Sequence, residues 1–196
     1  MPPKAKFTRD EIIETAFQIA KTDGLDKITA RELGKQLESS ARPIFTVFEN
    51  MEEVKAEVIA CAKELYRQYV LDGLQNEVAF KGVGIAYITF AIEEPKLFQL
   101  LFMSARAEQI DVEHILPMID ASYEEILQSV QIPYGLGRQA ADMIYQHLWT
   151  YTHGIATMCA TGLCNYTKEQ ISDRLTQIFK SLLMMEKGGF SGNDKN

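Results

Sequence analysis

Histidine is the side chain most often used in acid–base catalysis, and this 196-residue chain contains three of them. His114, His147 and His153 stand without a nucleophile in a recognisable catalytic motif. The stretch GVGIAY at residues 82–87 contains glycines, but it lacks the strand and turn of a dinucleotide-binding site. The sequence therefore predicts a protein that is not an enzyme and holds no cofactor.

Cysteine is the second residue type with chemical potential. Cys61, Cys159 and Cys164 are an odd number of thiols and include no CxxC pair. The stretch CATGLC has the wrong spacing for a zinc site and no histidine or carboxylate beside it. We therefore expect buried or half-buried thiols, with no metal and no redox role.

Residues 28–54, ITARELGKQLESSARPIFTVFENMEEV, have the apolar spacing of helices but are interrupted by Glu-Ser-Ser, Pro43 and Glu-Asn. This pattern predicts two very short helices, at 29–37 and 41–48, followed by the start of a third. Two helices this short build a poor core. They are typical of a helix-turn-helix, in which the second helix enters the major groove of DNA.

Capping residues indicate where these helices begin. Thr8 and Glu11 form a capping box at the start of a helix over 8–24. The sequence TARE repeats this pattern from Thr29. Ser40 is the predicted N-cap of the second short helix, which places Pro43 in a first turn that tolerates proline.

Asn50 is the predicted cap of a long helix over 51–73. The short helices and the helix over 8–24 should share a small apolar core. Its expected members are Leu25, Ile28, Leu33, Leu37, Ile44 and Phe48.

The remaining side chains of the second short helix are available for contacts with DNA. Arg42 is the best candidate for reading a base, because its guanidinium can pair with guanine O6 and N7. A solvated or phosphate-bound arginine is the alternative. Thr46 could contact a base, a thymine methyl or a phosphate. Pro43 and Phe45 could touch a methyl group or a sugar, although Phe45 could also pack inward.

The acidity of the chain is unevenly distributed. Residues 1–50 contain eight Lys or Arg and eight Asp or Glu, so the formal net charge of −7 belongs to residues 51–196. Lys4, Lys6 and Arg9 precede the first acidic residue and suit an arm that contacts phosphates. A solubilising tail is the alternative.

The run LGKQLESSARPIFTVFENMEEV resembles the TetR family of one-component transcriptional regulators. Ser40 falls on the turn serine of that family, Phe45 on the usual tyrosine and Phe48 on a characteristic phenylalanine. The upstream run AKTDGLDKITARELGKQL resembles the first two helices of the family. The resemblance implies DNA contacts from this region. The predicted set is Lys6, Thr29, Arg31, Ser40, Ala41, Arg42, Pro43, Phe45 and Thr46.

Three residues depart from the family pattern. Phe45 lacks the tyrosine hydroxyl, Val47 replaces a tyrosine or histidine, and Met51 replaces a lysine. These changes remove groups that could contact phosphates, so weaker or less salt-sensitive DNA binding is a hypothesis. The alternative function is a helical ligand-binding or interaction homodimer with weak or lost DNA binding.

The rest of the chain also has helical spacing. The predicted fold is all-α, with about nine helices: a helix-turn-helix domain at 1–50 and a helical ligand-binding and dimerisation domain at 51–190. The region after the long helix is divided into helices at 76–93, 95–104, 111–131, 137–162 and 167–186, with a loop at 132–137 and a disordered tail at 188–196.

The segment LWTYTHGIATM resembles the Trp-x-x-x-His-Gly signature of one branch of TetR C-terminal domains. That resemblance implies a small effector, and a lining of aromatic and methionine side chains suits a hydrophobic or aromatic one. Such side chains also commonly fill a core. The predicted lining is Phe98, Phe102, Met103, Tyr123, Leu127, Tyr145, Trp149 and His153.

A homodimer is expected through the helices at 137–162 and 167–186. The first contains Gly154, Ala156, Ala160 and Gly162, small residues that allow close helix approach, and the second has a broad apolar face. A twofold dimer would present two recognition helices to a palindromic operator in double-stranded DNA. Repression relieved by the effector is the expected regulation.

The location of the protein is predicted from two absences in the sequence. No apolar run of membrane-spanning length occurs, and the start MPPKAKF is unlike a signal peptide. The expected location is cytoplasmic, without a membrane partner.

Overall fold

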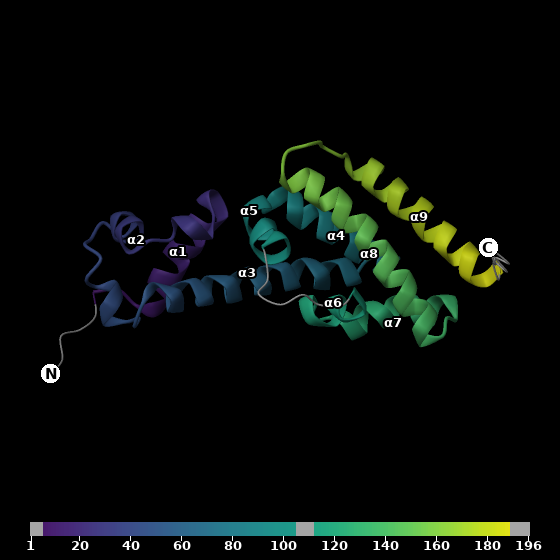
Figure 1. Cartoon of the computed structure of the whole chain (residues 1–196), viewed down its shortest axis with the longest axis horizontal. Coiled ribbons are helices and arrows are strands. Elements are labelled where there is room, and N and C mark those ends of the chain that lie inside the picture. The colour runs from purple at the N-terminus through teal and green to yellow at the C-terminus, as the bar shows by residue number, and fades with distance from the viewer. Residues whose placement is uncertain (1–5, 105–111, 189–196) are drawn as a thin grey trace, which may run out of the picture. The chain divides into compact units, whose positions relative to one another are not determined.

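The computed structural model describes residues 6–104 and 112–188, and all the regular elements in these ranges are helical. The described residues form two compact units. The N-terminal unit contains residues 6–66 and 93–104, and the C-terminal unit contains residues 67–92 and 112–188. Figure 1 labels the helices along the chain. The predicted all-α fold is confirmed.

The N-terminal unit begins with helix α1, Arg9–Asp23. The predicted capping box is present: the backbone N–H of Glu11 donates to Thr8 Oγ1 over 3.2 Å, and the N–H of Thr8 donates to Glu11 Oε2 over 2.7 Å. Gly24 follows at φ 93°, a conformation that favours glycine, and ends the helix.

The helical elements that follow α1 in this unit are short. They are a 3-10 helix at Leu25–Lys27, α2 at Ala30–Gln36, a 3-10 helix at Ile44–Thr46, α5 at Pro95–Phe98 and a π-helix at Gln99–Met103. The last two replace the single helix predicted over 95–104. Helix α5 packs on α1, where Lys21 Nζ lies 2.7 Å from Glu94 Oε1.

The apolar core predicted for the short helices is largely confirmed. Ile28, Leu33, Ile44 and Phe48 are buried, whereas Leu25 and Leu37 are half-buried. The capping box predicted at Thr29 is half present: Thr29 Oγ1 accepts from the Glu32 N–H over 3.1 Å, but the Thr29 N–H donates to Lys27 O instead of to Glu32.

The prediction of an α-helix over 41–48 is wrong. Only Ile44–Thr46 are helical, as one turn of 3-10 helix, and no side chain caps it, so the proposed Ser40 cap is also wrong. Pro43 has no N–H to donate, and the N–H groups of Ile44, Thr46 and Val47 bond three residues back. The segment is therefore a tight turn rather than a rod.

The turn before this segment lies directly on α2. A Cβ atom added at Gly34 would lie 3.1 Å from backbone atoms of Ser39, Ser40 and Ala41. The Ser39 N–H donates to Gly34 O over 2.8 Å, and Glu38 adopts a positive φ of 49° to complete the turn. Gly34 therefore allows the turn at residues 38–41 to pack directly on α2, and this contact sets the position of the residues that follow the turn.

Helix α3, Met51–Leu74, runs from the N-terminal unit into the C-terminal unit. The predicted cap is present, because Asn50 Oδ1 accepts from the Glu53 N–H over 3.0 Å. The C-terminal unit continues with α4 at Ala79–Glu93, α6 at Val112–Ile119, α7 at Tyr123–Tyr134, α8 at Arg138–Ala160 and α9 at Lys168–Gly188.

Helices α3 and α4 approach each other closely within the C-terminal unit. A Cβ atom added at Gly82 would lie 2.1 Å from the carbonyl oxygen of Gly73. The side-chain amide of Asn76 donates to the same oxygen over 3.0 Å. Two glycines therefore allow the backbones to meet where the chain turns from α3 into α4.

The predicted helix over 111–131 is two helices. The chain breaks at residues 120–122, where the buried Asp120 carboxylate accepts from the Ser122 N–H over 3.0 Å. This local bond competes with helix continuation. The predicted loop at 132–137 begins late, because α7 continues to Tyr134 and ends at Gly135, which has φ 64°.

Helix α9 ends at Gly188, the first residue of the predicted tail, and the rest of that tail lies outside the described residues. No helix in the described ranges is long and apolar enough to cross a membrane.

Candidate functional site

The candidate DNA-reading surface is centred on residues 41–48, here called the reading segment. Ile44 and Phe48 are fully buried and anchor it, whereas Arg42 and Thr46 are exposed. Phe45 leaves 47% of its surface exposed, so its ring does not pack inward. The Thr46 hydroxyl donates to Pro43 O over 2.6 Å, which fixes that side chain against its own turn. Arg42 is therefore the exposed cation of the segment.

The other residues predicted to contact DNA lie around α2 and the turn after it. Thr29 and Arg31 are exposed at the start of α2, and the Thr29 hydroxyl oxygen already serves as the helix cap. Lys6 Nζ donates to Ser39 Oγ over 2.9 Å and so lies at the turn. Ser40 is exposed, and Ala41 and Pro43 are half-exposed.

Acidic side chains lie in the same part of the chain. Glu38, Glu49 and Glu52 are exposed close in sequence to the reading segment. Their negative charge offsets that of the exposed cations and weakens attraction to a phosphate backbone. Overall charge therefore gives this surface little general attraction for a phosphate backbone.

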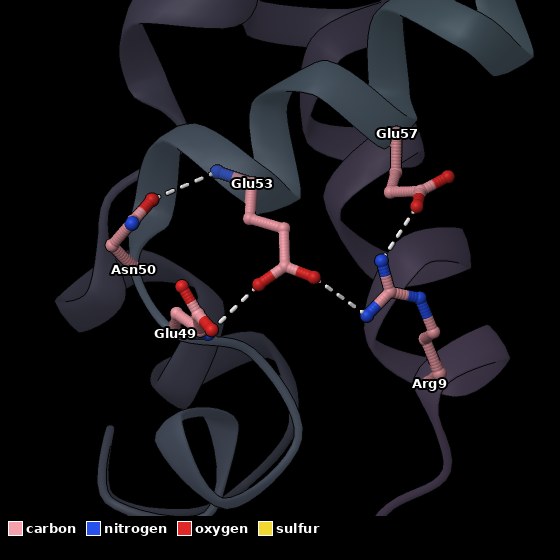
Figure 2. A network of polar contacts seen from close by, with 5 residues as sticks. All are labelled: Arg9, Glu49, Asn50, Glu53 and Glu57. Atoms are coloured by element: carbon pink, nitrogen blue, oxygen red, sulfur yellow. Dashed lines mark hydrogen bonds and ion pairs between the residues drawn. The ribbon is translucent and has the colours of Figure 1, made fainter.

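Arg9 does not extend as an arm. Its Nη1 lies 2.9 Å from Glu53 Oε1 and its Nη2 lies 2.5 Å from Glu57 Oε1, as Figure 2 shows. Its guanidinium carbon lies 4.2 Å from the centre of the Phe48 ring. The bond to Glu57 and then the bond to Glu53 raise the pKa of Arg9, so two carboxylates of α3 engage its charge although its side chain is 39% exposed.

Glu53 also binds the loop before α3. Its Oε2 accepts from the Glu49 N–H over 2.8 Å, and this bond, followed by the one from Arg9, lowers the pKa of Glu53. Asn50 caps the same helix turn (Figure 2). No local sequence pattern indicates this network, because Arg9 pairs with residues 44 and 48 positions away.

The structure divides the residues predicted to line an effector pocket between the two units. Phe98, Phe102 and Met103 belong to the N-terminal unit. Phe98 is fully buried, its ring centre lies 5.2 Å from that of Phe102, and Tyr66 meets the Phe102 ring edge-on at 4.9 Å. This cluster is part of a packed core, and Met103 is exposed beside it in sequence.

The other five predicted lining residues lie in the C-terminal unit. Tyr123 and Tyr145 stack with ring centres 5.8 Å apart, and Leu127 is fully buried. The Tyr123 hydroxyl donates to Asp142, and burial together with this carboxylate raises the pKa of Tyr123 to about 12. Burial also raises the pKa of Tyr145 well above its usual range. Both phenols are therefore neutral hydrogen-bond donors near pH 7.

Trp149 and His153 lie one helical turn apart on α8, and their rings stack with centres 5.1 Å apart. The hydroxyl of Tyr87 on α4 lies 2.8 Å from His153 Nδ1. Burial raises the pKa of Tyr87 and lowers the pKa of His153. Tyr87 and His153 are therefore a neutral phenol and a neutral imidazole joined by one hydrogen bond. No local sequence pattern marks Tyr87, which lies 66 positions from its partner.

We expect His153 to make the stability of the fold depend on pH. An unfolded histidine titrates near its ordinary pKa of about 6.5, whereas burial lowers the pKa of His153 in the folded chain. As pH falls through about 6.5, the unfolded chain takes up a proton that the folded chain does not, so the free energy of unfolding decreases. Urea denaturation followed by circular dichroism at several pH values measures this dependence. His153→Gln should flatten the curve over that interval, and an unchanged curve would contradict the assignment.

In the part of the chain that the structure describes, no group of three or more His, Cys, Asp or Glu side chains is placed to hold a metal ion. The three cysteines are free and half-buried, as predicted.

The N-terminal unit therefore joins α1, α2 and the turn that carries the reading segment, and a helical C-terminal unit follows it along the chain. Residues 80–183 match the family model described as "Tetracyclin repressor-like, C-terminal domain", which covers more than half of the chain. The chain therefore belongs to the TetR family of transcriptional regulators, which is not a family of enzymes. No protein with a curated description matches it.

Proposed function

We propose that this regulator is a repressor that binds a palindromic operator through its reading segment and leaves it when a hydrophobic or aromatic small molecule binds. The single observation that carries this proposal is the exposure of Arg42 and Thr46 on a segment anchored by buried Ile44 and Phe48. Anchored apolar residues hold the segment still, and exposed polar residues are free to meet bases.

Each exposed residue has a distinct proposed role. Arg42 pairs with guanine, Thr46 contacts a thymine methyl or a phosphate, and the exposed ring of Phe45 packs on a methyl or sugar. Lys6 and Arg31 contact phosphates, as do the polar groups around α2. The contacts from Thr29, Ser40, Ala41 and Pro43 position the segment on the backbone.

We propose that the effector binds among the aromatic residues of the C-terminal unit. Neutral tyrosines and a stacked Trp149–His153 pair offer flat apolar faces with a few hydrogen-bonding groups, which suits an aromatic ligand. The chain passes between the units along α3 and again where residues 93–104 rejoin the N-terminal unit. A ligand that prefers one of two packings of these connections shifts DNA affinity by its differential affinity.

We propose dimerisation through α8 and α9. Helix α9 buries Ile171, Leu175 and Phe179 on one face but exposes 74% of Met184 and 56% of Met185. Helix α8 exposes Met143 and, farther along, Gly154. Exposed methionines on both helices and an uncovered glycine on α8 suit packing against a second copy of the same helices.

Gly154→Ala should separate the effects of folding and dimerisation. A Cβ atom added at Gly154 meets nothing within 4 Å, so alanine should stabilise the isolated chain by about 0.5–1 kcal/mol through helix propensity. If a partner helix packs on this position, the same methyl group raises the dimer dissociation constant. Sedimentation equilibrium measures that constant, and thermal unfolding measures the fold.

Gly137→Ala is the matched control, because its added Cβ also meets nothing and it lies at the opposite end of α8. We expect this control to leave the dimer unchanged. Equal dissociation constants for Gly154→Ala and the wild type would argue against an α8 interface at this position.

Fluorescence anisotropy with DNA flanking the protein's own gene, measured across a salt series, tests the proposed function. We expect operator binding that exceeds binding to scrambled DNA and that weakens as salt rises. A hydrophobic or aromatic effector should lower the affinity. The result that would overturn the proposal is binding without sequence preference, or none.

The second candidate function is a ligand-binding or interaction homodimer without operator binding. The side chains in and around the reading segment favour it. Phe45 and Met51 lack phosphate-binding groups, and exposed Glu38, Glu49 and Glu52 add negative charge near the reading segment. Operator-independent behaviour in the anisotropy experiment would support it.

A further inference from the structure

We propose that Arg9 is a positioning residue for operator recognition, and that it acts by joining α1, the reading segment and α3 rather than by contacting DNA. This inference rests on the proposed function and adds a residue to it. Arg9 lies at the first position of α1, where a cation near the N-terminus of the chain would ordinarily be assigned to phosphate binding.

The guanidinium of Arg9 is already engaged in two ion pairs. Its two terminal nitrogens each meet a different carboxylate of α3, at 2.9 Å for Glu53 and 2.5 Å for Glu57. Figure 2 shows the guanidinium turned toward both acids from α1. The Arg9 side chain is 39% exposed, so a phosphate could reach it, but it would compete with two ion pairs for the guanidinium, and this competition disfavours a DNA contact.

Arg9 also contacts Phe48, the last residue of the reading segment. Its guanidinium lies over the ring of Phe48, 4.2 Å from the ring centre, and Phe48 is buried. Phe48 is one of the two apolar anchors of the segment that carries Arg42 and Thr46. A planar cation stacked on that ring limits how far the anchor can shift.

The carboxylate of Glu53, which binds Arg9, also binds the loop between the reading segment and α3. Glu53 accepts from Arg9 through Oε1 and from the Glu49 N–H through Oε2. Arg9 therefore orients Glu53, and Glu53 orients the backbone that leaves the reading segment. Arg9 therefore holds Phe48 directly and the backbone at Glu49 through Glu53.

A salt series separates this role from a phosphate contact. Arg9→Met should lower operator affinity by roughly tenfold at every salt concentration while the slope of log K against log salt stays unchanged. A lost phosphate contact would instead make that slope shallower by about 0.9. Lys63→Gln, which removes an exposed cation of α3, is the matched control and should bind as the wild type does.

A double variant, Glu53→Gln with Glu57→Gln, distinguishes a positioning role of Arg9 from a phosphate contact, because the two roles predict opposite changes in operator affinity. If Arg9 positions the segment, this variant weakens operator binding, and adding Arg9→Met to it causes little further loss. If Arg9 is a phosphate contact restrained by the acids, the variant frees it, so binding strengthens and the salt slope steepens. Glu38→Gln, which removes an exposed acid of the same unit, measures the effect of charge alone.

Hydrogen exchange, measured without DNA, tests the positioning role of Arg9 separately from operator binding. Arg9→Met should increase hydrogen exchange at the Glu49 amide, which depends on Glu53, while exchange at the buried core of α1 stays slow. If wild-type protein shows no operator preference, the proposed function fails and amide exchange alone decides the inference. Unchanged Glu49 exchange in Arg9→Met, or a shallower salt slope, would overturn it.

Discussion

Gly82→Ala is expected to destabilise the C-terminal unit by about 3 kcal/mol or more, which is the largest stability effect we anticipate for a single added methyl group. The new Cβ atom would lie 2.1 Å from the carbonyl oxygen of Gly73, far inside any allowed contact distance. The obstacle is backbone rather than the tip of a side chain, so rotamer changes cannot relieve it. Helices α3 and α4 would have to separate, and the Asn76 bond to the same oxygen would be lost.

Urea denaturation followed by circular dichroism measures this effect as a shift of the midpoint. The matched control is Gly84→Ala on the same helix, whose Cβ would meet Leu175 Cδ1 at 3.0 Å. Because that contact is the flexible end of a side chain, the cost should stay within about 1 kcal/mol. A wild-type midpoint for Gly82→Ala would mean that the two helices do not meet as described.

Arg42→Ala is expected to weaken operator binding by about 10- to 100-fold, equivalent to ~1–3 kcal/mol, while binding to scrambled DNA changes much less. Arg42 is the exposed cation of the reading segment, and its predicted partner is a guanine. Loss of a base contact relaxes specificity at one base pair of the operator. Changing that base pair should therefore leave the operator affinity of the Arg42→Ala variant unchanged.

Anisotropy titrations of an operator series, in which each base pair is changed in turn, measure this effect. Arg31→Ala is the comparison, because a phosphate contact should weaken all sequences equally and make the salt slope shallower by about 0.9. If Arg42→Ala bound the operator as tightly as wild type at several salt concentrations, Arg42 would have no recognition role.

Local signals in the sequence predicted much of the fold. The Thr8 and Asn50 caps and the helical spacing of apolar residues located α1 and α3 within one or two residues. Each of these features depends on residues within one helical turn, so it is readable without knowledge of the tertiary structure. The same reasoning identified Ile44 and Phe48 as buried anchors of the reading segment.

The failures arose where a local bond or a distant partner decided the structure. In the reading segment, the N–H groups of Ile44, Thr46 and Val47 bond three residues back in place of an α-helix. Asp120 accepts from the N–H two residues on, where α6 ends. The partners of Arg9 and Tyr87 lie 44 to 66 positions away, and no local pattern marks them. The predicted contacts with DNA and effector remain predictions for the same reason, since they depend on partners outside the chain.

The stacked pair on α8 provides an intrinsic optical probe. Trp149 is the chain's one tryptophan, so all indole emission comes from the C-terminal unit, beside the imidazole of His153. Excitation at the indole band therefore reports on this neighbourhood without a label or an engineered dye. Candidate effectors can be screened by emission quenching or a wavelength shift in unmodified protein, before any operator sequence is known.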